Sequence, residues 1–209
     1  MKKILFLDLD GTIVKSSVIL EFANYLIQKG IMKESNQQKN WLSDRKNDNY
    51  IREFGDYFRS QIIGMWDNDV RDLLQEFFNE FTFEFHNEVI TLINKCKREN
   101  YFCCIISGSI DYAVQLMADK LGIQGYGTVY NVVDGKHTGN LDVPMFSQKE
   151  KQKIIDTMIT THTEEVKGCG DTLSDVPIAL VSDEFYLVAP SEHTLKEYNR
   201  MGIEYKLVG

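Results

Sequence analysis

The sequence has no run of about 20 apolar residues, the length that a membrane-spanning helix needs. The apolar segment Ile4–Leu7 follows Met1-Lys2-Lys3 as in a signal peptide, but it ends at Asp8 and is too short for a secretory core. The four cysteines form no Cys-x-x-Cys pair and have no histidine at zinc-finger spacing. We therefore expect a cytoplasmic protein with reduced cysteines and no membrane contact.

Basic residues are scarce relative to acidic ones, with 23 Lys and Arg against 31 Asp and Glu and a net charge of −8. A nucleic-acid-binding surface needs a basic face, so the charge argues against a nucleic-acid partner. An anionic substrate would have to be attracted by local positive charge or by a metal ion. The 209 residues, 43% of them hydrophobic, suffice for one core with a small accessory unit. We expect a monomer or a homodimer.

Four short apolar or branched segments predict strands that are buried on both faces, at residues 4–7, 101–106, 165–169 and 185–188. Apolar residues spaced three and four apart predict helices at residues 89–93, 110–121 and 154–159, and Gly122 is a typical helix stop after the second of them. Strands that alternate with helices predict an α/β fold with a parallel sheet covered on both sides.

Two regions interrupt this alternation. Residues 16–85 contain helical patterns without a convincing strand, and Gly30 is expected to end the first of these helices. They predict a helical insert between the first strand and the rest of the sheet. Residues 126–140 contain Asp134-Gly135 between Val- and Thr-rich segments, which predicts a β-hairpin.

Polar residues follow three of the predicted strands directly. The segments are Asp8 to Thr12, Ser107 to Ser109, and Gly170 to Asp175. Ligands of an open parallel sheet bind beyond the carboxyl ends of its strands, so we expect these three segments to meet at one edge. Two acids directly after a buried strand serve no obvious packing purpose, which favours a functional role for Asp8 and Asp10.

The residue types at this edge suit phosphate chemistry. Four aspartates would repel one another unless a cation lay among them, and oxygen ligands favour magnesium. A carboxylate can attack phosphorus, and a second acid two residues later can transfer protons. Ser107 and the N–H groups near Gly108 can bind phosphate oxygens. The alternative interpretation of Ser107 is a cap of the helix that begins near Ile110.

Asp8-Leu9-Asp10-Gly11-Thr12 resembles the first signature of the haloacid dehalogenase superfamily. Ser107 is similar to its second signature, and Gly170-Asp171 with Asp175 to its fourth. The third signature is a lysine that opens a helix with an apolar residue four positions later. Lys149, Lys151 and Lys153 are candidates, and Lys151 with Ile155 fits best. The signatures occur in the order of the family and span almost the whole predicted core.

This resemblance implies a Rossmann-like three-layer α/β core at residues 1–15 and 86–209, with a helical cap domain at residues 16–85. It also implies a Mg2+-dependent phosphatase that acts on a small phosphorylated metabolite through an aspartyl-phosphate. Its implied site consists of the nucleophile Asp8, the general acid and base Asp10, the metal ligands Asp8, Asp10 (through its backbone carbonyl), Asp171 and Asp175, and the substrate-binding residues Thr12, Ser107, Gly108 and Lys151. Dehalogenases of the superfamily lack the second aspartate, so Asp10 favours phosphatase chemistry.

Residues 105–140 resemble the phosphoserine-phosphatase branch, with two departures. Ser17 stands where that branch carries a glutamate for the substrate amino group, and Gly108-Ser109 stands where Gly-Gly is usual. Arg59 is the best candidate to meet a substrate carboxylate. Two other functions compete with hydrolysis: phosphoryl transfer to an alcohol, and a non-catalytic regulatory protein that binds a phosphate ligand.

Overall fold

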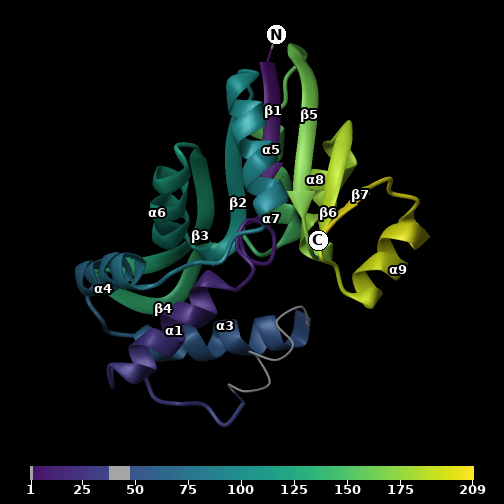
Figure 1. The fold of residues 1–209 in the computed structure, drawn as a ribbon. Coiled ribbons are helices and arrows are strands. Elements are labelled where there is room, and N and C mark those ends of the chain that lie inside the picture. Colours follow the sequence, from purple (N-terminus) through teal and green to yellow (C-terminus); the bar gives the residue numbers. More distant parts are fainter. Residues whose placement is uncertain (1, 38–47) are drawn as a thin grey trace.

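Residues 2–37 and 48–209 are described in a computed structural model (Figure 1). They form a seven-stranded sheet with the order β4-β3-β2-β1-β5-β6-β7. The strands are β1 (Lys2–Leu7), β2 (Phe102–Ile110), β3 (Gln124–Val133), β4 (Lys136–Val143), β5 (Thr163–Gly170), β6 (Glu184–Val188) and β7 (Lys206–Val208). The neighbouring strands from β3 to β7 pair in parallel, and only β4 runs antiparallel at the edge. The predicted parallel sheet is therefore confirmed.

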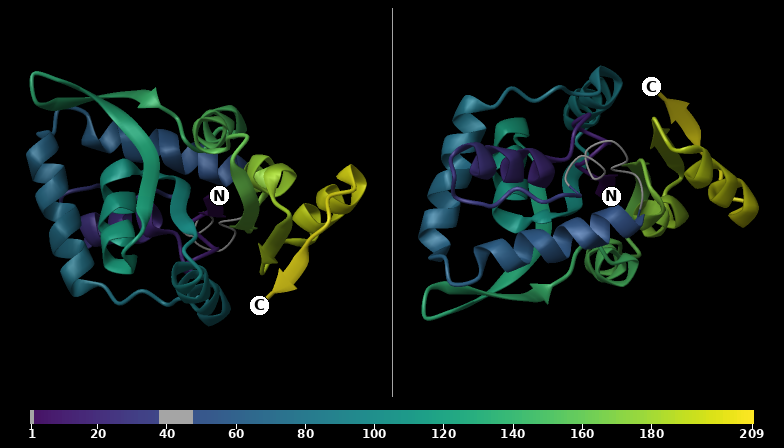
Figure 2. Two further views of the ribbon diagram at one scale, coloured as in Figure 1. Left: turned by 90° about the horizontal axis from the view of Figure 1, so that it is seen from above. Right: turned by 90° about the horizontal axis from the view of Figure 1, so that it is seen from below.

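The central strand β1 is buried on both faces, which explains its continuous apolar sequence. Leu5 and Leu7 point into one hydrophobic cluster, and Ile4 and Phe6 point into a second cluster on the opposite face. Helices α5 (Asn87–Arg98) and α6 (Asp111–Leu121) pack on the first face. Helices α7 (Gln148–Met158), α8 (Val176–Val181) and α9 (Glu192–Met201) contribute to the second cluster, which gives the predicted three-layer core (Figure 2).

In the described part of the chain, three helices follow β1 and precede α5: α1 (Val18–Gln28), α3 (Asp48–Ile62) and α4 (Asp67–Glu80). They lie beyond the end of the sheet at which β1 finishes (Figure 1). Phe22 packs against Phe58 and Phe77, with ring centroids 6.2 and 5.6 Å away, so aromatic rings join the three helices. Residues 38–47 of the predicted cap lie outside the described residues, and its division from the core stays a prediction.

The predicted hairpin is confirmed as β3 and β4, whose turn residues Asp134 and Gly135 have φ angles of 50° and 77°. The first half of β3 also pairs in parallel with β2, which the sequence did not indicate. The far end of the hairpin contacts the connection between α3 and α4. His137 makes two backbone hydrogen bonds with this connection. The N–H of Gly64 donates to the His137 carbonyl at 2.8 Å, and the N–H of His137 donates to the Met65 carbonyl at 3.0 Å.

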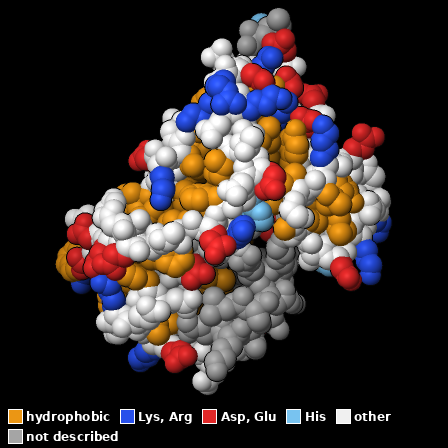
Figure 3. Space-filling model, in the orientation of Figure 1, with side chains coloured by type: hydrophobic (Ala, Val, Ile, Leu, Met, Phe, Trp, Pro, Cys, Tyr) orange, Lys and Arg blue, Asp and Glu red, His pale blue; other side chains and the backbone are white. Residues whose placement is uncertain are grey.

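Paired charges cover the amino end of the sheet, over the starts of β1 and β5 in the upper part of Figure 3. Lys3 lies 3.6 Å from Glu165, and Lys167 lies 3.4 Å from Glu165 and 3.1 Å from Glu184. The predicted site residues Asp8, Asp171 and Asp175 lie at the opposite, carboxyl end of the strands. Among the described helices, none is both long and apolar enough to cross a membrane.

Candidate active site

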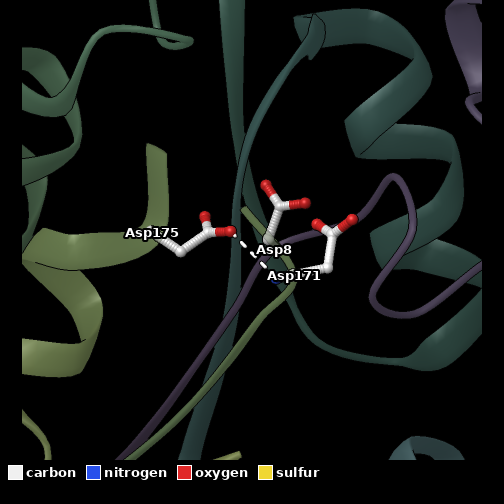
Figure 4. Close-up of side chains that lie close together, drawn as sticks. All are labelled: Asp8, Asp171 and Asp175. Atoms are coloured by element: carbon white, nitrogen blue, oxygen red, sulfur yellow. Dashed lines mark hydrogen bonds between the residues drawn. The ribbon is translucent and has the colours of Figure 1, made fainter. Parts of the chain in front are cut away.

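The three polar segments meet at the carboxyl edge of the sheet, as the sequence predicts. Asp8 directly follows β1, and its N–H continues the ladder by donating to Cys169 at 3.0 Å. Asp171 directly follows β5, and Asp175 lies in the short 3-10 helix η1 (Leu173–Asp175). Figure 4 shows the carboxylates of these three aspartates close together. One oxygen from each lies within 4.8 Å of the others, an arrangement that could hold a metal ion.

Lys151 provides the positive charge of this cluster. Its side chain is 1% exposed, and Nζ lies 2.8 Å from Oδ1 of Asp8 and 2.6 Å from Oδ1 of Asp175. The two carboxylates raise the pKa of Lys151 above its usual value, although burial alone acts in the opposite direction. Lys149 is exposed, and Lys153 pairs with Glu150 on the outer surface. The structure therefore brings the preferred lysine, and neither alternative, to the carboxylates.

The charges around Asp8 favour the binding of a further cation. Burial raises the pKa of Asp8 well above its usual value, Lys151 opposes this, and the charges of Asp175 and Asp171 add to the increase. One ammonium group thus does not fully offset three clustered carboxylates. The cluster consists of oxygen donors alone, which fits a hard cation such as Mg2+.

Asp175 is held by the turn in which it lies. Its Oδ2 accepts hydrogen bonds from the N–H groups of Asp171 and Thr172, both at 3.1 Å, and its Oδ1 faces Lys151. Gly170 makes this turn possible, because a Cβ atom there would lie 2.4 Å from Cβ of Asp175. Asp175 therefore fixes both the loop after β5 and the ammonium group of Lys151.

The loop after β1 packs against Asp171. Gly11 has a φ angle of +81°, and a Cβ atom at this residue would lie 2.3 Å from Oδ2 of Asp171. Thr12 is fully buried, and its hydroxyl donates to Oδ1 of Asp171 at 3.3 Å. Substrate binding by Thr12 stays a prediction, and its hydroxyl contacts Asp171, a predicted metal ligand.

The carboxylate of Asp10 is separate from the cluster of three aspartates. Its Oδ1 accepts the N–H of Val18 at 2.6 Å, and its Oδ2 accepts the hydroxyls of Ser109 at 2.5 Å and Ser107 at 3.4 Å. Burial raises the pKa of Asp10, and the hydrogen bonds from Ser109 and Val18 oppose that increase. The roles of Asp10 as acid and base, and as a metal ligand through its backbone carbonyl, stay predictions.

Ser107 is fully buried at the carboxyl end of β2, and its Oγ accepts the N–H of Ser109 at 3.2 Å. Helix α6 begins at Asp111 without a side-chain cap, so Ser107 does not cap it. The adjacent Gly108 faces Phe146, because a Cβ atom at Gly108 would lie 3.0 Å from Cβ of Phe146. Both residues thus lie at the predicted edge beside Asp10.

A cavity of about 750 Å³ opens beside these residues. Its walls combine Asp8, Asp10 and Asp171 with residues of the helical segment and the hairpin. Ser17 and Arg59 line it, and Arg59 pairs with Asp56. Several other lining residues have no distinctive motif in the sequence that would have indicated a role. They are Arg52, Phe54 and Asp56 of the helical segment, Thr128 and Tyr130 of the hairpin, and Phe146 before α7.

Comparisons with known proteins agree with this fold. The family model for haloacid dehalogenase-like hydrolase matches residues 5–180. A crystal structure of a protein with unknown function from Bordetella pertussis Tohama I is similar over 100% of this chain and 99% of that chain, with a TM-score of 0.81 and 14% identity. No curated protein matches the sequence.

Two further solved structures carry names that mention phosphoserine. A phospho-aspartyl intermediate analogue of phosphoserine phosphatase matches with a TM-score of 0.67 and 16% identity, over 99% of this chain and 93% of that chain. A phosphoserine phosphohydrolase-like protein from Francisella tularensis subsp. tularensis SCHU S4 matches with a TM-score of 0.66 and 18% identity, over 100% of this chain and 95% of that chain. At such identities, the similarity shows a shared fold.

Proposed function

The chain belongs to the haloacid dehalogenase-like hydrolase family, and on this basis we propose that it is a Mg2+-dependent phosphatase of a small phosphorylated metabolite. The observation that carries the proposal is the buried Lys151, which bridges Asp8 and Asp175 at the edge of the sheet. A buried ammonium group between carboxylates can neutralise a phosphoryl group that enters from the cavity. Phosphatase names among similar folds support the same chemistry.

In the first step, an oxygen of Asp8 attacks phosphorus and the bond from phosphorus to the leaving oxygen breaks. Asp10 gives its proton to that oxygen, which leaves as an alcohol. The product on the enzyme is an aspartyl-phosphate on Asp8. Lys151, Ser107 and the N–H groups near Gly108 bind the phosphoryl oxygens in this proposal.

In the second step, water attacks the same phosphorus while Asp10 accepts a proton from it. The bond between phosphorus and Asp8 breaks, which releases phosphate and restores the carboxylate. Asp8, Asp171, Asp175 and the backbone carbonyl of Asp10 are the proposed Mg2+ ligands, and the ion supplies positive charge for the phosphoryl oxygens when bound. Residues 16–85 act as a cap that excludes water and selects the substrate.

A transferase that passes the phosphoryl group to an alcohol would use the same residues, and only the acceptor would differ. Analysis of the products with added alcohols separates the two, because a transferase forms a new phosphate ester. A non-catalytic phosphate-binding protein would not need both acids together with Lys151. Trapping of beryllium fluoride on Asp8 without turnover of any substrate would favour that alternative.

The test is turnover of a panel of phosphorylated metabolites with Mg2+, followed by the same assay on Asp8→Asn. We expect release of phosphate by the wild-type protein and none by the variant, with an unchanged circular dichroism spectrum. Phosphate release that survives in Asp8→Asn would show that the nucleophile is another residue. A folded protein that hydrolyses no member of the panel would count against the proposal as a whole.

A further inference from the structure

Groups from two separate elements hold the carboxylate of Asp10. The N–H of Val18, the first residue of α1, donates to Oδ1 at 2.6 Å. The hydroxyl of Ser109, in the last part of β2, donates to Oδ2 at 2.5 Å. The hydroxyl of Ser107 is more distant, at 3.4 Å. Ser109 therefore makes the short side-chain contact with this carboxylate, and Ser109 and Asp10 both line the cavity.

The position of the Ser109 hydroxyl is preset by its surroundings. Ser109 is 1% exposed, and its N–H donates to Oγ of Ser107 at 3.2 Å. On one side, the hydroxyl of Thr128 donates to the carbonyl of Gly108 at 2.7 Å. On the other side, the N–H of Gly127 donates to Oδ1 of Asp111 at 2.8 Å. Residues of β3 thus bind Gly108 through its carbonyl and Asp111 through its side chain, on either side of Ser109.

Gly127 is what allows this close approach. A Cβ atom at Gly127 would lie 2.4 Å from Cα of Asp111 and 2.9 Å from the carbonyl oxygen of Ser109. A side chain at this position would push the segment that carries Ser109 away from β3. The absence of a side chain at Gly127 therefore helps to determine where the Ser109 hydroxyl lies.

We propose that Ser109 is a positioning residue that holds Asp10 for both of its proton transfers. The inference rests on the proposed phosphatase function. The N–H of Val18 can only donate, so it stabilises Asp10 as a carboxylate. A hydroxyl can donate to a carboxylate and can also accept from a carboxylic acid. Ser109 can therefore keep Oδ2 in place both before and after its proton moves.

The two steps make different demands on this arrangement. In the first step, the Asp10 proton moves to the leaving oxygen as the phosphorus–oxygen bond breaks, which matters most for a poor leaving group such as an alkoxide. In the second step, a water proton moves to Asp10 as the bond from phosphorus to Asp8 breaks. This step is the same for every substrate. Loss of Ser109 should therefore have effects that depend on the leaving group.

The first experiment compares Ser109→Ala with wild type on p-nitrophenyl phosphate and on the best alkyl phosphate of the metabolite panel. For the alkyl ester, we expect kcat/KM to fall about tenfold or more, the size expected for a lost hydrogen bond to a charged group. For p-nitrophenyl phosphate, kcat and KM should fall together and leave kcat/KM within about threefold of wild type. Equal losses of kcat/KM on both substrates would overturn the inference.

The second experiment is a double-mutant cycle with Asp10→Asn, using kcat for p-nitrophenyl phosphate. If Ser109 acts through Asp10, Ser109→Ala should lower kcat in the wild-type protein and change it less than about twofold in the Asp10→Asn background. Additive losses would show that Ser109 acts independently of Asp10, and would overturn the inference.

Ser60→Ala is the matched control, because Ser60 is an exposed serine of α3 whose hydroxyl donates to the carbonyl of Tyr57. It should match wild type in both assays. Thermal unfolding of each variant identifies loss of the folded protein, and the comparison between the two substrates is made within one variant, so partial unfolding would lower both rates alike. A wild-type protein that turns over neither substrate would overturn the phosphatase function itself, an outcome distinct from those above.

Discussion

Nζ of Lys151 lies 2.8 Å from Oδ1 of Asp8, a residue 143 positions away in the chain. The same ammonium group lies 2.6 Å from Asp175. Helix α7, the end of β1 and the short helix η1 therefore meet in one buried ion cluster. Breaking such a cluster by removing one partner is costly, because the remaining charges stay buried. This makes the site a determinant of stability as well as of the proposed chemistry.

Lys151→Met should therefore destabilise the protein without Mg2+, by about 3–5 kcal/mol. The side chain is similar in length, but the carboxylates of Asp8 and Asp175 lose their shared cation. Urea denaturation measures the change. Lys153→Met on the same helix is the control and should cost less than about 1 kcal/mol, because Lys153 makes an exposed pair with Glu150. Equal effects of the two substitutions would contradict the role of the cluster.

Magnesium should stabilise the folded protein, because a cation relieves the repulsion among Asp8, Asp171 and Asp175. At a concentration 100 times its dissociation constant, a bound ion adds about 2.7 kcal/mol to the free energy of unfolding. The midpoint of thermal unfolding should rise with Mg2+ in wild type and stay constant in Asp171→Asn. Asp156→Asn, at an exposed residue that accepts from Gln152, should respond like wild type. An unaltered response in Asp171→Asn would place the ion elsewhere.

Gly11→Ala should both destabilise the protein and abolish turnover. Its φ angle is +81°, and the new Cβ atom would lie 2.3 Å from Oδ2 of Asp171. Gly30 has a similar φ angle of +72°, but a Cβ atom there would point into open space, with no neighbouring group within 4 Å. Gly30→Ala should therefore cost only the backbone strain, about 1–2 kcal/mol, and keep turnover. Similar losses in both variants, measured by urea denaturation and phosphate release, would show that contact with Asp171 is unimportant.

His137 should make stability depend on pH. Burial lowers its pKa below 6.5, although the nearby Asp67 acts in the opposite direction and Arg71 acts in the same direction. In the unfolded chain, His137 binds a proton near the usual histidine pKa. In the folded chain, it binds the proton only at a lower pH. The free energy of unfolding should therefore decrease as the pH falls below about 6.5, until the lower pKa of the folded state is reached.

Urea denaturation at pH values from about 7.5 to about 5, on both sides of the usual histidine pKa, measures this slope. His137→Gln should make the slope shallower, because glutamine does not titrate. His193→Gln, at an exposed residue, should keep the slope of wild type. An unchanged slope in His137→Gln would assign the pH dependence to other groups.

The sequence predicted the core of the fold because burial on both faces leaves a simple pattern. Residues 4–7 and 101–106 are continuously apolar; the first segment lies within β1, and all of the second except Tyr101 lies within β2. The polar segments after these strands could then be placed at one edge by topology alone. The choice of Lys151 among three lysines followed from one apolar residue, Ile155, which is fully buried.

Other features left weaker patterns. Strand β7 has only three residues, two of them exposed, so its sequence has no alternation to detect. The dual pairing of β3 depends on tertiary contacts between its first half and β2. The orientation of Thr12 toward Asp171 follows from the path of the loop at Gly11. The contacts of Asp10 with Val18 and Ser109 join three segments, and no spacing along the chain records such a meeting.

The contact between the hairpin and the α3–α4 connection has a consequence for building chimeric proteins. Gly64, Met65 and Asp67 all use backbone groups of His137 or Gly135 as hydrogen-bond partners. A graft of residues 16–85, the predicted cap, would keep these hydrogen bonds only if the receiving core carried a hairpin in the same position. We therefore expect a working chimera to need the β3–β4 hairpin as well as the predicted cap.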